Sequence, residues 1–137
     1  MNSAEVQDAI FERGEKANAE YFTGNAWVKT LLANDAIFNC QIGNVVFEKG
    51  SRNNWHTHPA GQILIVTDGI GYYQERGKPI QTIHKGDVIK ILPNVVHWHG
   101  ASHDHELTHI AINPNTNYGI IDWLERVTDD EYNEMKL

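Results

Sequence analysis

The stretch NWHTHPAGQ, residues 54–62, holds two histidines two positions apart and an amide side chain four positions after the second. Side chains at alternate positions of a β-strand point to the same face, so His56 and His58 are expected to project together. A turn at Pro59-Ala60-Gly61 would then bring Gln62 back toward them. The spacing predicts three side chains converging on one point, as the ligands of a metal ion do.

Histidine is concentrated in two parts of the sequence. Of 8 histidines in the chain, only His84 stands apart. The others are His56 and His58 in the first part, and His97, His99, His103, His105 and His109 in the second. A fold that brings the two parts together would gather several imidazoles in one place.

Composition excludes several other classes of protein. The formal net charge is −7, which argues against binding to nucleic acid, because that needs clustered Lys and Arg. No run of about 18 apolar residues predicts a membrane span, and residues 1–16 lack the pattern of a signal peptide. The single cysteine, Cys40, excludes an internal disulfide and fits a reducing compartment. We therefore expect a cytoplasmic protein that binds neither nucleic acid nor a membrane.

The order of local patterns predicts a mainly β chain. Short apolar and β-branched runs alternate with turn signals about every ten residues from Val28 onward. The predicted strands are 27–32, 36–47, 53–58, 62–67, 70–75, 80–84, 88–91, 95–99 and 107–112. Many short strands at this spacing favour an antiparallel sandwich or barrel. We expect one domain over residues 1–137, with its core at about residues 36–112.

A helix is predicted at each end of the chain. Residues 3–22 have Ser3 as a candidate N-cap and a partial apolar stripe, with Gly14 as a weak point. Thr128 is followed three residues later by Glu131, which is a capping-box signature for a helix over residues 129–135.

The glycines, histidines and proline of the central region resemble the two motifs of the cupin superfamily. The first motif, G-x5-HxH-x3,4-E-x6-G, is matched by Gly50, His56, His58, Gln62 and Gly69, with Gln62 in the Glu position. The second, G-x5-PxG-x2-H-x3-N, is matched less closely by Gly86, Pro93 and His97, with Val95 and Ala101 at its glycine and Asn positions. The resemblance implies an all-β fold, the antiparallel double-stranded β-helix or cupin jelly-roll barrel, with short N- and C-terminal helices.

Longer strings resemble one subgroup, the small single-domain bacterial cupins. These strings are WHTHPAGQ at 55–62, HWHGA at 97–101, THIAI at 108–112 and DWLERVTDDEY at 122–132. The subgroup includes the cupin-type (R)-hydroxynitrile lyases and the cupins associated with carboxymuconolactone decarboxylase domains. The resemblance implies one divalent transition metal, held by His56, His58, Gln62 and His97. It favours manganese and leaves iron, nickel, zinc and cobalt open.

The resemblance also assigns residues around the metal. His109 would lie in the cavity and act as a general base, with an ordinary pKa near 6.5. Gly43 and Val45 would line the cavity and leave room for a substrate of aromatic size. The resemblance further implies a small-molecule substrate and a homodimer, for which we expect residues 22–32 and the strand of Trp55 to form the contact.

The side chains at the four candidate ligand positions suit a divalent metal ion. First-row divalent metals accept imidazole nitrogen well, and Gln62 can ligate through its carbonyl oxygen because its amide nitrogen only donates. The usual cupin Glu brings a negative charge, whereas Gln62 brings none. A neutral set of ligands leaves the cation its full charge and makes it a stronger Lewis acid.

Other interpretations of these residues are open. The four ligand candidates could be an ordinary hydrogen-bonded cluster, and His109 could be a buried histidine with a structural partner only. His99 is in phase with His97, so it could face inward, support the ligands from behind, or point to solvent beyond the rim. His103, Asp104 and His105 are expected in a solvated loop, and His84 on the surface. Trp55 and Trp98 are expected to pack on the opposite side of their strands, and Cys40 to be unreactive.

Three functions follow from these expectations. The first is a metal-dependent lyase that cleaves a cyanohydrin, resembling the hydroxynitrile lyases. The second is a metal-dependent oxygenase or dioxygenase, which the missing carboxylate disfavours. The third is a non-catalytic protein that binds a small ligand. The fold alone does not distinguish them, because many activities share it.

Overall fold

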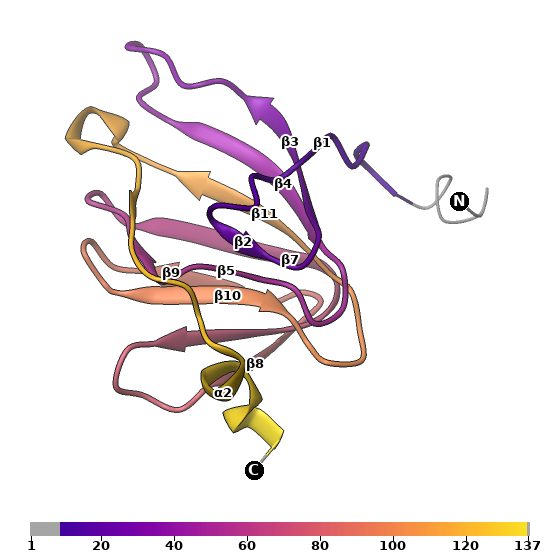
Figure 1. Cartoon of the computed structure of the whole chain (residues 1–137). Helices are drawn as coiled ribbons and strands as arrows, with labels where there is room; N and C mark the ends of the chain where they lie inside the picture. The colour runs from indigo at the N-terminus through magenta and orange to yellow at the C-terminus, as the bar shows by residue number, and fades with distance from the viewer. Residues whose placement is uncertain (1–8, 137) are drawn as a thin grey trace.

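The computed structural model describes residues 9–136, whose strands form one strongly curled antiparallel sheet (Figure 1). Across the sheet the strands follow the order β1-β3-β4-β11-β7-β10-β5-β2; β8 and β9 pair with β7, and β6 pairs with β10 and β12. The strands are β1 (Glu15–Lys16), β2 (Phe22–Thr23), β3 (Ala26–Leu32), β4 (Gln41–Phe47), β5 (Arg52–Asn53), β6 (His56–Thr57), β7 (Gln62–Glu75), β8 (Gln81–His84), β9 (Val88–Ile91), β10 (His97–Ala101), β11 (Leu107–Asn113) and β12 (Asp122–Trp123). The predicted all-β antiparallel fold is confirmed.

Strand β7 joins the two parts of the curled sheet. Its first half pairs with β9 and β11, and its second half pairs with β8 and β10. The sequence predicted two strands here, separated by a turn at Asp68-Gly69. Instead, residues 62–75 form one continuous strand that bends at Gly69, where φ is 81°. The bend lies next to a shift in the register between β7 and β11 at Thr108 and His109. An added residue on one strand makes such a bend, and a glycine accommodates its positive φ.

Two predicted strands are shorter than the sequence suggested. The strand predicted over 36–47 begins only at Gln41, because the Asp35 carboxylate accepts the N–H groups of Ile37 and Phe38 and holds a turn. The strand predicted over 53–58 is interrupted at residues 54–55. There the Trp55 N–H donates to the carbonyl of Glu125, so this segment bonds to the C-terminal part of the chain.

The predicted N-terminal helix is wrong over residues 9–22; residues 3–8 lie outside the described residues. Residues 15–16 form strand β1, in which Glu15 pairs with Val28 and Lys16 with Trp27 of β3. Gly14 has φ 82° and lies so close to the Val28 carbonyl that a side chain would not fit. Gly14, which is unfavourable within a helix, therefore lies directly before strand β1.

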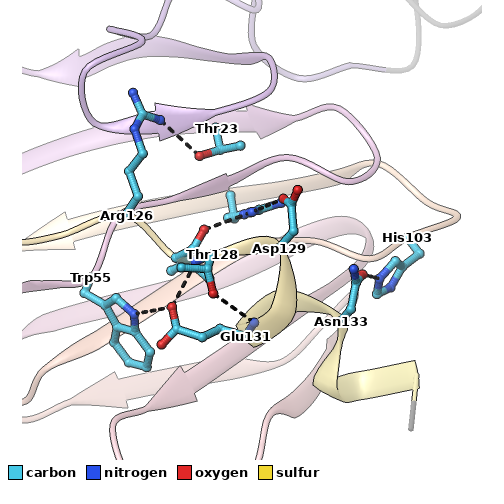
Figure 2. Close-up of polar contacts among 10 residues, drawn as sticks. Thr23, Trp55, His103, Arg126, Thr128, Asp129, Glu131 and Asn133 are labelled. Atoms are coloured by element: carbon cyan, nitrogen blue, oxygen red, sulfur yellow. Dashed lines mark hydrogen bonds and ion pairs between the residues drawn. The ribbon is translucent and has the colours of Figure 1, made fainter.

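The C-terminal segment confirms the capping box. The Glu131 N–H donates to the Thr128 hydroxyl at 3.1 Å, and the Thr128 N–H donates to the Glu131 carboxylate at 2.9 Å (Figure 2). Helix α2 (Asp129–Tyr132) follows, and the 3₁₀ helix η2 (Asn133–Lys136) continues it. The predicted helix over 129–135 is thus present, with its second half in the tighter form.

Two clusters of apolar side chains pack against the sheet. The inner cluster includes Phe47, Leu64, Ile83, Ile91 and Leu107. The outer cluster, formed by Trp55, Tyr72, Trp98, Val127 and Tyr132, lies beneath the C-terminal segment. Trp55 and Trp98 therefore pack in the core, as the sequence predicted. No helix in the described part of the chain has the length and apolar character that crossing a membrane requires.

Candidate functional site

The curled sheet holds a cavity of about 250 Å³ with largely apolar walls. Phe22, Val28 and Ile42 contribute to these walls, together with Gly43 and Val45, which the sequence predicted to line it. Of the described residues that line the cavity, none is acidic. Small-molecule sites commonly combine an apolar wall with a few converging polar groups.

Three of the four predicted metal ligands, His56, His58 and Gln62, line this cavity, and His97 packs against the two histidines. His56 of β6 and His97 of β10 are paired in register, with ring centroids 4.2 Å apart. The His58 ring lies 5.0 Å from that of His56 and 5.5 Å from that of His97. The predicted turn is present, since the Gly61 N–H donates to the His58 carbonyl at 3.0 Å and Gln62 begins β7 directly after it. All four side chains are buried.

Backbone carbonyls fix the proton on each of the three imidazoles. Nδ1 of His56 lies 2.7 Å from the Asn54 carbonyl oxygen. Nδ1 of His58 lies 2.6 Å from that of Ile120, and Nδ1 of His97 lies 2.9 Å from that of Val95. A carbonyl only accepts, so a neutral ring must carry its proton on Nδ1 and leave the Nε2 lone pair free. This arrangement is typical of histidines that ligate a metal through Nε2.

Three acceptor atoms in this group are buried without a hydrogen-bond partner. They are Nε2 of His58, Nε2 of His97 and Oε1 of Gln62. The other end of the Gln62 amide is satisfied, because its Nε2 donates to Oδ1 of Asn113 at 2.9 Å. Buried polar atoms are rarely unpaired, and three such acceptors on neighbouring residues fit a bound cation.

His99 is buried, which excludes the expectation that it points to solvent. One ring nitrogen from each of His56, His97 and His99 lies within 4.8 Å of the other two, so these three histidines could hold a metal ion. However, the His99 ring already has partners. Asn53 Nδ2 lies 3.2 Å from Nε2 of His99, and His109 Nε2 lies 3.2 Å from its Nδ1.

His109 lines the cavity, as the family resemblance implied. It shares its buried face with Leu107 and Ala111. Its Nδ1 is buried without a hydrogen-bond partner. Burial lowers the pKa of His109 from the ordinary 6.5 to about 4.

The remaining site histidines are also neutral near pH 7. Burial is the main cause, because it disfavours the charged imidazolium. It lowers the pKa of His97 to about 4, and it lowers the pKa of His56 well below its ordinary value, with His97 and His58 adding to the effect. The pKa of His58 is lowered less. The Ile120 carbonyl, Asp122 and the neighbouring Gln62 amide favour the charged imidazolium and so offset part of the effect of burial. Neutral imidazoles can bind a cation without first losing a proton.

The other residues singled out in the sequence lie away from the cavity. His84, Asp104 and His105 are exposed, as expected. His103 is instead half-buried, with Nδ1 2.8 Å from the Tyr72 hydroxyl. Its Nε2 lies 2.8 Å from the Asn133 side-chain oxygen (Figure 2). Cys40 is half-buried and free.

Sequence reasoning missed three residues at the site: Asn53, Asn113 and Trp123. Asn113 is in phase with His109 and Ala111 along β11, so alternation could have found it. Trp123 packs against His56 with ring centroids 4.9 Å apart and stacks on Tyr21 at 4.6 Å. No local pattern pointed to Trp123 or Asn53, because their place depends on long-range pairing of the C-terminal segment and of β5.

Comparisons with known proteins agree with this fold. Residues 43–113 match the family of the cupin domain. The chain is 41% identical over 128 residues to the (R)-mandelonitrile lyase of Granulicella tundricola, covering 93% of this chain and 98% of that protein.

Solved structures give the same result. A cupin-like protein from Thermotoga maritima superposes with a TM-score of 0.91 at 55% identity, over 93% of this chain and 96% of the other. A cupin 2 conserved barrel domain protein from Rhodopseudomonas palustris has a TM-score of 0.67 at 19% identity, over 89% and 81% of the two chains, and is similar in fold alone.

Proposed function

Because this chain belongs to the cupin family, we propose that it is a metal-dependent lyase that cleaves a small cyanohydrin into an aldehyde and hydrogen cyanide. The observation that carries this proposal is a group of buried, unpartnered acceptors beside an apolar cavity. They are Nε2 of His58 and Oε1 of Gln62, two residues that line the cavity, and Nε2 of the neighbouring His97. The similarity to a protein named (R)-mandelonitrile lyase supports the substrate class.

The metal ligands in this proposal are His56, His58 and His97 through Nε2, and Gln62 through Oε1. Each of the three rings is held by a carbonyl at Nδ1, which leaves Nε2 available. We prefer this set to one with His99, because both His99 nitrogens already lie within hydrogen-bond distance of Asn53 or His109. Manganese is our first choice of metal by family resemblance, and iron, nickel, zinc and cobalt suit the same donors.

The charge of the ligand set favours lyase chemistry. All four ligands are neutral, and no described residue lining the cavity is acidic. A bound divalent cation would therefore keep its full charge and act as a Lewis acid toward the hydroxyl or nitrile group of the substrate. Oxygenases pass through higher oxidation states, which an anionic ligand would stabilise better, so the neutral set disfavours that alternative.

His109 is the proposed base. Its ring lines the cavity and is neutral near pH 7, so it can accept the hydroxyl proton of a cyanohydrin. As the O–H bond breaks, the C–O bond becomes a carbonyl, and the bond to the nitrile carbon breaks with its electron pair on cyanide. The imidazolium of His109 then returns its proton to cyanide, which leaves as hydrogen cyanide.

The cavity walls fit an aromatic or other apolar substituent on the substrate. Apolar side chains from β3 and β4, including Val28 and Val45, surround one side, and Trp123 lies on the other side beside His56. At about 250 Å³ the cavity suits a small molecule. Among the described residues, only the histidines contribute ionisable side chains to its lining, so no carboxylate, lysine or arginine there would hold a charged substituent.

Metal content and activity together test the proposal. Untagged wild-type protein and His58→Ala are compared by elemental analysis, with His84→Ala as the control for an exposed histidine. We expect one metal per chain in wild type and control, and its loss in His58→Ala. Each metal is then restored separately, and aldehyde and cyanide release from (R)-mandelonitrile are measured alongside oxygen uptake.

The outcomes separate the three functions. Cyanide release that depends on metal supports the lyase. Oxygen uptake without cyanide release would indicate an oxygenase, and ligand-induced stabilisation without turnover would indicate a binding protein. A wild-type protein that neither contains metal nor takes it up on titration would contradict both enzymatic functions.

A further inference from the structure

Three amide side chains form a chain of hydrogen bonds across neighbouring strands at the cavity. Gln62 is the first residue of β7, Asn113 the last of β11, and Gln41 the first of β4. Nε2 of Gln62 donates to Oδ1 of Asn113 at 2.9 Å, and Nδ2 of Asn113 donates to Oε1 of Gln41 at 3.0 Å. All three side chains line the cavity. We refer to Gln41, Asn113 and Gln62 as the amide relay.

We propose that Asn113, held by Gln41, is the positioning residue that fixes which end of the Gln62 amide faces the histidines. An amide has one accepting and one donating end, and only the oxygen can ligate a cation. Because Asn113 Oδ1 takes the Gln62 N–H, the Gln62 oxygen is left facing away from Asn113. That oxygen is buried and has no hydrogen-bond partner, as expected for an atom reserved for another ligand.

The orientation of the Asn113 amide depends in turn on Gln41. If the Asn113 amide were reversed, its Nδ2 would face Gln62 and attract the Gln62 oxygen. The Gln62 N–H₂ would then turn toward the lone pairs of His58 and His97, where it would block a cation. Gln41 opposes this reversal, because its Oε1 accepts the Asn113 N–H and would meet the Asn113 oxygen instead. Register supports the arrangement, since Asn113 and Gln41 are directly paired across β11 and β4.

This inference rests in part on the proposed function, because a fixed orientation of the Gln62 oxygen affects function only if that oxygen ligates the metal. The orientation of the amide, however, is set by atoms of the chain and can be measured without metal. A group held in its binding orientation before the ligand arrives loses less conformational freedom on binding. Partners that orient a ligand in this way typically change metal affinity about 10- to 100-fold when removed.

The test compares Asn113→Leu with Asn113→Asp. Leucine removes the acceptor for Gln62, whereas aspartate keeps an accepting oxygen in its place. Cobalt(II) is added to metal-free protein, and its affinity and absorption spectrum are measured by titration. We expect Asn113→Leu to bind cobalt about 10- to 100-fold more weakly with an altered spectrum. Asn113→Asp should keep the wild-type spectrum and at least the wild-type affinity, and Thr30→Val, at the cavity wall outside the relay, should match wild type.

A second measurement uses metal-free protein. The side-chain amide NMR signal of Gln62, assigned by its loss in Gln62→Glu, should show one hydrogen-bonded proton in wild type and in Asn113→Asp, and lose it in Asn113→Leu. Gln41→Leu, which leaves Asn113 Oδ1 in place, should weaken the same signal and serves as the second variant if Asn113→Leu does not fold.

Two results would overturn the inference: an Asn113→Leu protein that matches wild type in both measurements, or an Asn113→Asp protein that fails as Asn113→Leu does. Wild-type protein that binds no cobalt yet shows the bonded Gln62 proton would contradict the proposed function and leave the amide orientation supported.

Discussion

At the scale of single residues, the environment of His109 changes what its sequence position implied. A solvated histidine would be half protonated near pH 6.5, but burial lowers the pKa of His109 to about 4. The residue is therefore already neutral and able to accept a proton at any pH well above 4. A base of low pKa is also a weak one, so in the proposed reaction the rest of the site would have to lower the pKa of the substrate hydroxyl.

Replacing His109 by alanine should abolish most of the lyase activity and leave the metal in place. Loss of a general base typically costs about 10²- to 10⁴-fold in rate. His109 is outside the proposed ligand set, so elemental analysis should find the wild-type metal content in His109→Ala. The measurement is cyanide release at saturating (R)-mandelonitrile, with His84→Ala as the control. A His109→Ala protein with wild-type rate would assign His109 a structural role only.

Replacing Gln62 by glutamate should strengthen metal binding and slow the lyase. The carboxylate adds a negative charge to an otherwise neutral ligand set, which attracts the cation and reduces its Lewis acidity. It also removes the N–H that Asn113 Oδ1 accepts at 2.9 Å, which leaves two oxygens facing each other there. Titration of metal and steady-state rates check the two effects separately. Faster cyanide release in Gln62→Glu would contradict the argument from charge.

At the scale of elements, the C-terminal segment is the clearest case in which sequence predicted structure. The Thr128–Glu131 capping box is a local pattern, and local hydrogen bonds are sufficient to form it. Helix α2 then places Tyr132 in the outer apolar cluster, where its hydroxyl donates to the Ala101 carbonyl at 2.7 Å. Arg52, nearly buried, donates to Asp129 at 2.8 Å and ties the same segment to β5.

Replacing Thr128 by alanine should destabilise the protein by about 1 kcal/mol, the usual cost of losing an N-cap side chain. The Glu131 N–H would lose its acceptor, and the start of α2 would fray. Urea denaturation measures the free energy of unfolding, and Thr128→Ser, which keeps the hydroxyl, is the matched control. Equal stability of the alanine and serine variants would mean that tertiary contacts of Tyr132 alone hold the helix.

The elements that sequence predicted wrongly depend on distant partners. Residues 9–22 carry a weak helical stripe, yet Glu15 and Lys16 pair with β3 because an unpaired strand was available there. Asp68-Gly69 carries a turn signal, yet β10 and β11 hold both sides of it in one strand, β7. Turn residues indicate where a chain can bend, whereas pairing decides whether the strand ends there. The same limit applies at the site: His56 and His58 follow from alternation, but the Asn53 contact to His99 required the whole fold.

At the scale of the whole molecule, the fold buries five uncharged histidines in one group, and four of them line the cavity. The five are His56, His58, His97, His99 and His109, and burial is the largest cause of the lowered pKa in each. The unfolded chain would protonate all of them at an ordinary pKa of 6.5. Folding therefore competes with protonation as the pH falls.

The metal-free protein should consequently lose stability as the pH falls from about 6.5 toward 4. Between these values the unfolded state binds more protons than the native state, so the free energy of unfolding rises with pH. The contribution of His97 and His109 is complete above their unfolded pKa of 6.5 and is lost progressively as the pH falls to their native pKa of about 4. Carboxylates with lowered pKa values, such as Glu75 and Glu125, lose their contribution only below their ordinary value of 4.5.

Urea denaturation of metal-free protein at a series of pH values measures this slope. His109→Gln removes one of the titrating groups, so its free energy of unfolding should depend less steeply on pH over the same interval. Its slope should match wild type only well below pH 4, where His109 is protonated in both the native and the unfolded state. Bound metal should oppose the loss, because it binds only the native state with unprotonated ligands, until protons displace it. A metal-free protein whose stability is constant between pH 6.5 and 4 would mean that the histidines titrate in the native state as they do in solvent. In that case the cavity would be open to water, and the unpartnered acceptors at its wall would be hydrated and no longer indicate a metal.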